Sequence, residues 1–147
     1  MVKESIERLR YLCDTLPAKL DKIPDDEFSK KTGPEKWSKK EILGHLIDSA
    51  ANNHHRFVRA QFDDNPLVTY DQNQWNHSGH YADMEKSHLI KFWALYNRHL
   101  VELAKRIPVD LLNRKISIDP DKSVPLEFVI NDYLVHLEHH LHQLVDY

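Results

Sequence analysis

The clearest helix start in this chain lies within the stretch WSKKEILGHLIDS, residues 37–49. Ser38 stands at the N-cap position and Glu41 follows three residues later, which is the spacing of a capping box. Apolar residues at helical spacing then continue to about Gln61, and the polar stretch around Pro66 ends the pattern. This stretch therefore predicts a long amphipathic helix.

Three further segments show the same apolar periodicity. The first runs from Lys3 to Asp21, and Pro17 is expected to kink it or to end it early. Another begins with Asp83 as its cap and runs to Arg106, just before Pro108. The last begins near residues 123–125, with a proline tolerated in the first turn, and continues to the C-terminus.

Four such helices, without a convincing strand, predict an all-α fold, a four-helix bundle that forms a single domain over residues 1–147. Only three glycines are present, too few for the tight turns of an all-β protein. The connection between the second and third helices, residues 62–82, is long for a bundle and carries aromatic and histidine residues. We expect it to form an ordered lid.

Composition and charge exclude several classes of protein. Apolar residues make up 41% of the chain and charged residues 29%, and the net charge is −3 with scattered lysines and arginines. That pattern argues against nucleic acid or an anionic membrane as the partner. No apolar run approaches the roughly 20 residues needed to cross a bilayer. A charged N-terminal segment and a single cysteine, Cys13, predict a cytoplasmic protein without an intrachain disulfide.

Eleven histidines are the unusual feature of the composition, and histidine is the commonest metal ligand. His136 and His140 are four residues apart on the last predicted helix, so they share one face. His45 interrupts an apolar run on the second helix. A lone buried histidine is more often hydrogen-bonded in the core than bound to a metal. Three histidines on two helices of one bundle nevertheless predict a shared divalent ion.

The helix face that carries the buried histidine continues as a polar stripe. It includes Ser49 and Asn52, which we expect to contact a substrate if the stripe lines a wet pocket. Arg56 is a candidate catalytic residue that could bind a substrate carboxylate through two N–H groups, or could instead pair with a carboxylate of the connection such as Asp71. Asp48 is a candidate hydrogen-bond acceptor behind the metal ligands, or a general base.

Tyr70 and Trp75 belong to the long connection, and they could form an aromatic wall of the same pocket. As plain packing residues they would show the same sequence pattern. We therefore predict substrate contact for both, with a purely structural role as the alternative.

Three groups of residues together resemble the DinB/YfiT-like superfamily of metal-binding four-helix bundles. They are residues 37–49, the pair 56–57 with the segment YDQNQW at 70–75, and HLEHH at 136–140. In that family one histidine of the second helix and a His-x3-His pair of the fourth hold the ion, usually zinc or nickel. These positions match His45, His136 and His140. The resemblance also implies that the second and third helices run parallel, which the long connection permits.

Relatives of the YfiT type often have a further histidine where this chain has Gln143. The difference leaves the three matched ligand positions intact, and it removes any role for a fourth histidine there.

A site with three histidines leaves at least one coordination position open for chemistry. The resemblance implies S-transfer, as in bacillithiol and mycothiol transferases, from a low-molecular-weight thiol to an electrophilic small molecule. Hydrolysis by a metal-bound hydroxide and a non-catalytic metal-binding stress protein remain alternatives. Transfer ranks slightly higher because no obvious carboxylate base stands directly beside the metal, and Asp48 is the residue that could reverse this order. A homodimer is a further expectation, since bundles of this size often pair through an exposed helix face.

Overall fold

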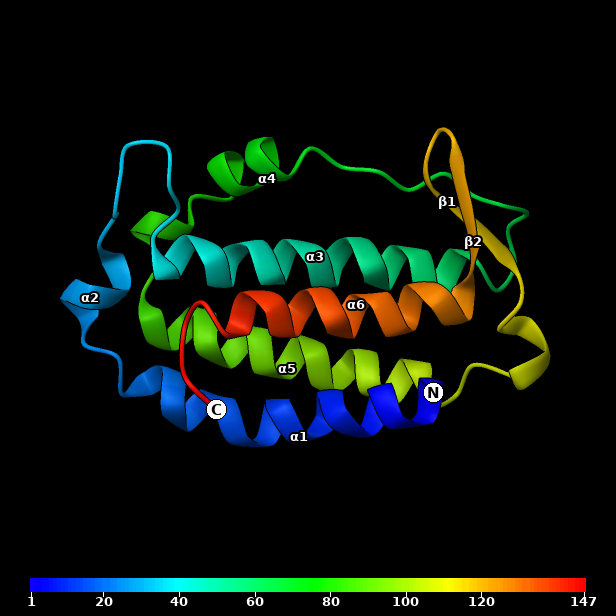
Figure 1. Cartoon of the computed structure of the whole chain (residues 1–147), viewed down its shortest axis with the longest axis horizontal. Coiled ribbons are helices and arrows are strands. Elements are labelled where there is room, and N and C mark those ends of the chain that lie inside the picture. Colours follow the sequence, from blue (N-terminus) through cyan, green and yellow to red (C-terminus); the bar gives the residue numbers. More distant parts are fainter.

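The computed structural model describes residues 1–147 and shows four long helices with a small hairpin (Figure 1). Two helices, α1 and α3, each pack against both of the others, α5 and α6. This arrangement confirms the predicted helical bundle. The helices are α1 (Val2–Asp21), α3 (Lys39–Arg59), α5 (Lys86–Ala104) and α6 (Leu126–Leu141).

Helices α3 and α5 run in the same direction, and α1 and α6 run in the opposite one (Figure 1). Because α3 and α5 are consecutive long helices, the chain must return along the bundle between them. The returning segment contains the short helix α4 (Gln72–Gly79) and a 3-10 turn, η1 (Tyr81–Asp83), both of which pack on α3. The long connection is therefore ordered, as expected.

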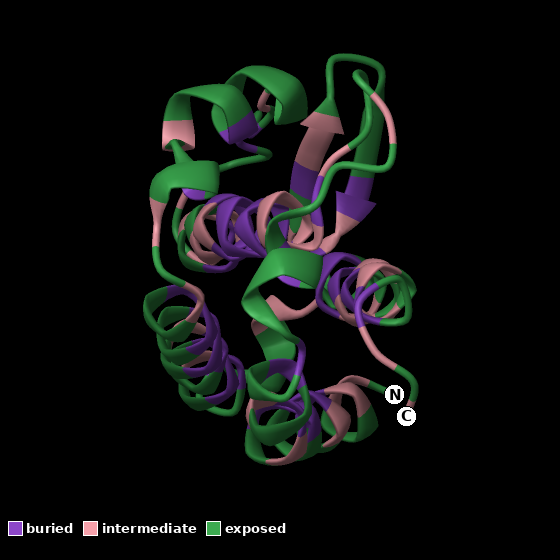
Figure 2. Ribbon diagram, turned by 90° about the vertical axis from the view of Figure 1, so that its left-hand side faces the viewer, coloured by how far each residue is buried: buried purple, intermediate pink, exposed green.

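The core lies between the four helices, where apolar side chains recur every three or four residues. Figure 2 shows the buried positions gathered on the inward faces of the helices. Fully burying a side chain such as Leu or Phe stabilises the fold by roughly 1.5–3 kcal/mol. None of the helices is long and apolar enough to cross a membrane. The largest fully buried side chains include Leu12, Leu16, Leu43, Phe57, Trp93 and Leu126.

Several predicted helix limits differ from the structure. Helix α1 continues through Pro17 to Asp21, so the proline does not end it early. Helix α5 is capped at Glu85 rather than at Asp83, which lies in η1. Helix α6 ends at Leu141, before the C-terminus. A short helix, α2 (Asp25–Ser29), was not predicted, and it packs against α3.

The hairpin of β1 (Lys115–Asp119) and β2 (Lys122–Pro125) was also missed. The residues predicted to begin the last helix, 123–125, belong to β2, and the helix starts one residue later with Pro125 as its cap. The hairpin is joined to the returning segment, since the Val68 N–H donates to the Ser117 carbonyl over 3.1 Å. Two short strands with mixed polarity gave too weak an alternation to stand out from a loop.

Candidate metal centre

The capping box predicted at the start of α3 is present, and it fixes where this helix begins. The Glu41 N–H donates to the Ser38 side chain over 3.1 Å, and the Ser38 N–H donates to the Glu41 carboxylate over 3.0 Å. Two otherwise unpaired N–H groups of the first turn are thereby satisfied. His45 follows two turns into the helix, and its side chain is completely buried.

Three histidines from two helices converge on one point. One ring nitrogen from each of His45, His136 and His140 lies within 4.8 Å of the other two. The Nε2 atoms of His45 and His136 are 3.3 Å apart. Two nitrogens bound to one tetrahedral zinc at 2.0–2.1 Å stand about 3.3 Å from each other, so this pair has the spacing that a shared ion requires.

The environment keeps two of these imidazoles neutral, which is the form that binds a metal. Burial, with a smaller contribution from the neighbouring His136 and His140, lowers the pKa of His45 to about 3. Burial also lowers the pKa of His136 to about 4, with a further contribution from His140 and an opposing one from Asp132. The donor set and its charge state therefore fit a divalent cation.

Gln143 sets the orientation of the third histidine. The His140 Nδ1 atom lies 2.9 Å from the Gln143 Oε1 atom. With the Gln143 oxygen as acceptor, the tautomer of His140 that carries its proton on Nδ1 makes this bond, and its Nε2 lone pair is then free for a metal. Gln143 therefore contacts the candidate ligand His140 directly.

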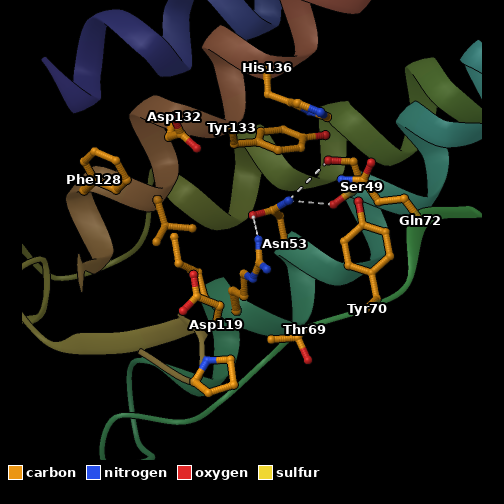
Figure 3. A pocket seen from close by; sticks show the side chains of 14 residues that line it. Ser49, Asn53, Thr69, Tyr70, Gln72, Asp119, Phe128, Asp132, Tyr133 and His136 are labelled. Carbon is orange, nitrogen blue, oxygen red and sulfur yellow. Dashed lines mark hydrogen bonds between the residues drawn. The ribbon is translucent and has the colours of Figure 1, made fainter. Parts of the chain in front are cut away.

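A cavity of about 470 Å³ reaches one of the three histidines, His136, which is among the residues that line it (Figure 3). Its walls come from α3, α6, the returning segment and the hairpin. Polar groups dominate on α3, where the Asn53 side chain donates to the Ser49 carbonyl over 2.8 Å. The lining residues include Ser49, Asn53, Arg56, Tyr70, Asp119, Asp132, Tyr133 and His136.

Three of the six predicted catalytic and substrate-binding residues meet in this cavity beside His136, namely Ser49, Arg56 and Tyr70. The Arg56 guanidinium donates to the Val68 carbonyl through Nε and Nη2, over 3.2 and 2.8 Å. It forms no ion pair with Asp71, which instead caps α4 by accepting from the Gln74 N–H. Burial lowers the pKa of Arg56, and its positive charge has no direct carboxylate partner.

The other three of these six residues lie outside the cavity lining. Asn52 is buried and donates to the Asp48 carbonyl over 2.9 Å. Trp75 is 43% exposed, with its ring 5.7 Å from that of Tyr70. Asp48 is buried and accepts a hydrogen bond from the Tyr81 hydroxyl. Burial raises the pKa of Asp48 to about 6, although the bond from Tyr81 opposes the shift.

Sequence reasoning missed several residues around the site. Asn53 links Ser49 to Arg56, because its Oδ1 accepts from Arg56 Nη1 over 3.3 Å. Asp132 lines the cavity one turn before His136, and this i, i+4 spacing is visible in the sequence. Tyr81 reaches Asp48 from 33 residues away, and no local pattern signals that contact.

The second and third long helices of this bundle, α3 and α5, run parallel, and three histidines converge in it, which defines a class of helical bundles with a candidate metal site. The family model of the DinB superfamily matches residues 2–144 of this chain. The chain belongs to the DinB superfamily.

Curated and solved relatives agree with this membership. The chain is 22% identical over 141 residues to a protein of Oceanobacillus iheyensis named "Putative metal-dependent hydrolase OB0413", covering 95% of this chain and 81% of that one. YfiT from Bacillus subtilis, described as a probable metal-dependent hydrolase with an unusual four-helix bundle topology, superposes with a TM-score of 0.81 at 20% identity. The match covers 97% of this chain and 85% of YfiT.

A mycothiol-dependent maleylpyruvate isomerase superposes with a TM-score of 0.79 at 12% identity. The match covers 98% of this chain but only 60% of that larger protein. Identities this low establish a shared fold and leave the activity of this chain open to proposal.

Proposed function

We propose that this protein is a divalent-metal-dependent enzyme that transfers a low-molecular-weight thiol to an electrophilic small molecule. The observation that carries the proposal is the convergence of three imidazoles beside a cavity that His136 also lines. His45, His136 and His140 would hold zinc or nickel. Such an ion, when bound, lowers the pKa of a thiol and stabilises it as a thiolate.

The chain's own residues then bind and orient the reactants. Arg56 has N–H groups beyond those that donate to Val68 and Asn53, and these can bind a substrate carboxylate. Ser49 and Tyr70 present neighbouring hydroxyl groups to the cavity (Figure 3). In this proposal Asn52 and Trp75 act indirectly, Asn52 on the α3 backbone at Asp48 and Trp75 against the Tyr70 ring.

The proposed reaction is a substitution at the electrophile. The thiol loses its proton to solvent, its sulfur forms a bond to the electrophilic carbon, and the leaving group departs with the bonding electron pair. Transfer is favoured over hydrolysis because Asp48 is buried against Tyr81 and does not line the cavity. In that position it is poorly placed to take a proton from an attacking water.

Hydrolysis remains a second candidate because one observation favours it. Asp132 lines the same cavity as His136 and stands four residues before it on α6, so a carboxylate is available near the proposed centre. The hydrolase descriptions of two relatives point in the same direction. In this alternative Asp132 acts as the general base.

Elemental analysis of untagged protein tests the metal centre. Wild type is expected to contain near-stoichiometric zinc or nickel, and His45→Ala and His136→Ala are expected to lose it. His139→Ala is the matched control, because His139 is an exposed histidine of the same helix outside the three-histidine cluster. A metal-free wild type that also refuses added zinc, or full occupancy in both ligand variants, would overturn the proposal.

Activity assays on the zinc-loaded protein separate transfer from hydrolysis. Thiols of different charge are combined with an alkylating electrophile, and activated esters are tested without thiol. Thiol-dependent turnover that weakens in Arg56→Lys supports transfer to or from a carboxylate-bearing molecule. Ester cleavage that is lost in Asp132→Asn or Asp48→Asn at full metal occupancy would establish hydrolysis instead.

A further inference from the structure

Tyr81 is held against the backbone of two glycines. A Cβ atom at Gly44 would lie 2.2 Å from the Tyr81 ring, and one at Gly79 would lie 2.6 Å from it. These separations are far shorter than any van der Waals contact, so the ring fits only because neither neighbour has a side chain. Tyr81 is itself buried, with 8% of its surface exposed.

The hydroxyl of this fixed ring donates to Oδ1 of Asp48 on α3. Asp48 is only 3% exposed, and its second oxygen, Oδ2, has no hydrogen-bond partner. Buried polar atoms in proteins are almost always paired. An unpaired carboxylate oxygen at this depth therefore points to a hydrogen-bond donor that can approach it.

His45 has a matching unpaired atom. Its Nε2 faces His136, whereas its Nδ1 is buried without a partner. The Trp37 ring lies 4.9 Å from the His45 ring, but an indole N–H can only donate and so cannot pair with an imidazole N–H. His45 and Asp48 are three residues apart on one helix, a spacing at which side chains are neighbours.

We propose that Tyr81, acting through Asp48, is a positioning residue for the metal ligand His45. In the metal-bound protein the His45 Nδ1–H donates to Asp48 Oδ2, while the Tyr81 hydroxyl holds Oδ1. This bond fixes the tautomer that presents the Nε2 lone pair to the ion. Histidine ligands commonly donate their second ring N–H to a carboxylate in this way.

The inference rests on the proposed metal centre. It gives the proposed ligands His45 and His140 the same kind of support, an oxygen that accepts from the ring N–H facing away from the ion. Gln143 accepts from His140 on α6, and Asp48 plays the corresponding part for His45 on α3. The difference is that Gln143 belongs to the ligand's own helix end, whereas Asp48 is held by a residue from the returning segment. The placement of that segment therefore affects the affinity of the metal site.

Tyr81→Phe and Asp48→Asn test the inference in the full chain. Zinc affinity is measured by chelator competition, and the His45 ring is followed by NMR of zinc-loaded, 15N-histidine-labelled protein, assigned with His45→Gln. Both variants are expected to bind one zinc with about 10- to 100-fold lower affinity. The Nδ1–H signal of His45 should shift or exchange faster, which a merely structural defect would not produce.

Tyr96→Phe is the matched control, because its hydroxyl pairs with His54 over 2.9 Å, and neither residue belongs to the three-histidine cluster. It should leave zinc affinity and the His45 signal unchanged. If wild type binds zinc and both test variants match it in affinity and in the Nδ1–H signal, the positioning role is wrong. If wild type binds no zinc, the metal centre itself is wrong, so the two failures are distinguishable.

Discussion

Three titratable side chains of this site are buried or half-buried without an ion-pair partner, and burial shifts the pKa of each. His45 and His136 are held neutral, and Asp48 is held with a raised pKa. All three shifts arise mainly from desolvation, which disfavours the charged form of a buried group. The same shifts make the stability of the metal-free protein depend on pH.

Metal-free protein is expected to lose stability as the pH falls below about 6.5. An unfolded histidine binds its proton near pH 6.5, whereas folded His45 and His136 stay neutral down to about pH 3 and 4. The unfolded chain therefore binds more protons in this window, and each such histidine lowers stability by at most about 1.4 kcal/mol per pH unit. Asp48 acts in the opposite sense between about pH 4 and 6, because it is the folded state that holds its proton there.

Urea unfolding in the presence of a chelator, at several pH values from 7.5 to 4.5, measures this dependence. His45→Gln removes one of the two histidine contributions, so the free energy of unfolding of this variant should fall less steeply as the pH is lowered. Parallel curves for the wild type and the variant would show that His45 is not buried as a neutral imidazole.

Among the elements, α3 and η1 meet where the Tyr81 ring packs against the backbone of Gly44. Gly44→Ala is expected to lower the free energy of unfolding by about 1–3 kcal/mol, because the new methyl group collides with the Tyr81 ring. The higher helix propensity of alanine offsets part of this loss, at most about 1 kcal/mol. If Tyr81 positions Asp48 as proposed, zinc affinity falls as well.

Gly33→Ala is the control for this substitution. Its added Cβ would meet only the flexible side chain of Lys36 at 3.7 Å, so stability should change little. Thermal and urea unfolding measure the stability of Gly44→Ala and Gly33→Ala against wild type. Equal stability of Gly44→Ala and wild type would mean that the helix and η1 separate easily.

The end of α3 depends on an arginine from just before the hairpin. Arg114 donates to the Ala60 carbonyl over 2.7 Å and to the Asp63 carbonyl over 3.0 Å, which satisfies acceptors beyond the last helical turn. Arg114→Ala should therefore destabilise the fold by about 1–3 kcal/mol. Arg106→Ala, which removes an exposed guanidinium paired with Glu102, should change stability by less than about 0.5 kcal/mol. The urea unfolding midpoints of the two variants measure these changes. A similar loss of stability in both variants would contradict a specific role for Arg114 at the end of α3.

For the molecule as a whole, the proposed ion would join two helices that are far apart in sequence. His45 lies on α3 and the other two ligands lie on α6, so binding to the folded state alone stabilises the entire bundle. Zinc at 100 times its Kd should add about 2.7 kcal/mol and raise the Tm by several degrees.

Thermal unfolding with increasing zinc measures that effect. His136→Ala should show no zinc-dependent rise, while His139→Ala should behave like wild type. An equal rise in all three proteins would point to binding elsewhere among the eleven histidines.

The sequence alone predicted the four long helices and the candidate ligand set. A capping box, an apolar period and a His-x3-His pair are all local, because a helix closes its hydrogen bonds within four residues. The box at Ser38 and Glu41 is present as predicted, and the three candidate ligands do converge. The resemblance of three segments to a known superfamily added the parallel order of the middle helices.

Only the tertiary structure decided how the site is enclosed. The cavity walls, the hairpin and the contact between Tyr81 and Asp48 join segments that sequence spacing does not relate. The local sequence also did not decide whether helix α1 ends at Pro17. The helix continues to Asp21 although the proline has no N–H to donate. Such contacts depend on how whole helices and strands pack together. The free energy of that packing comes from burying apolar side chains that are distant along the chain.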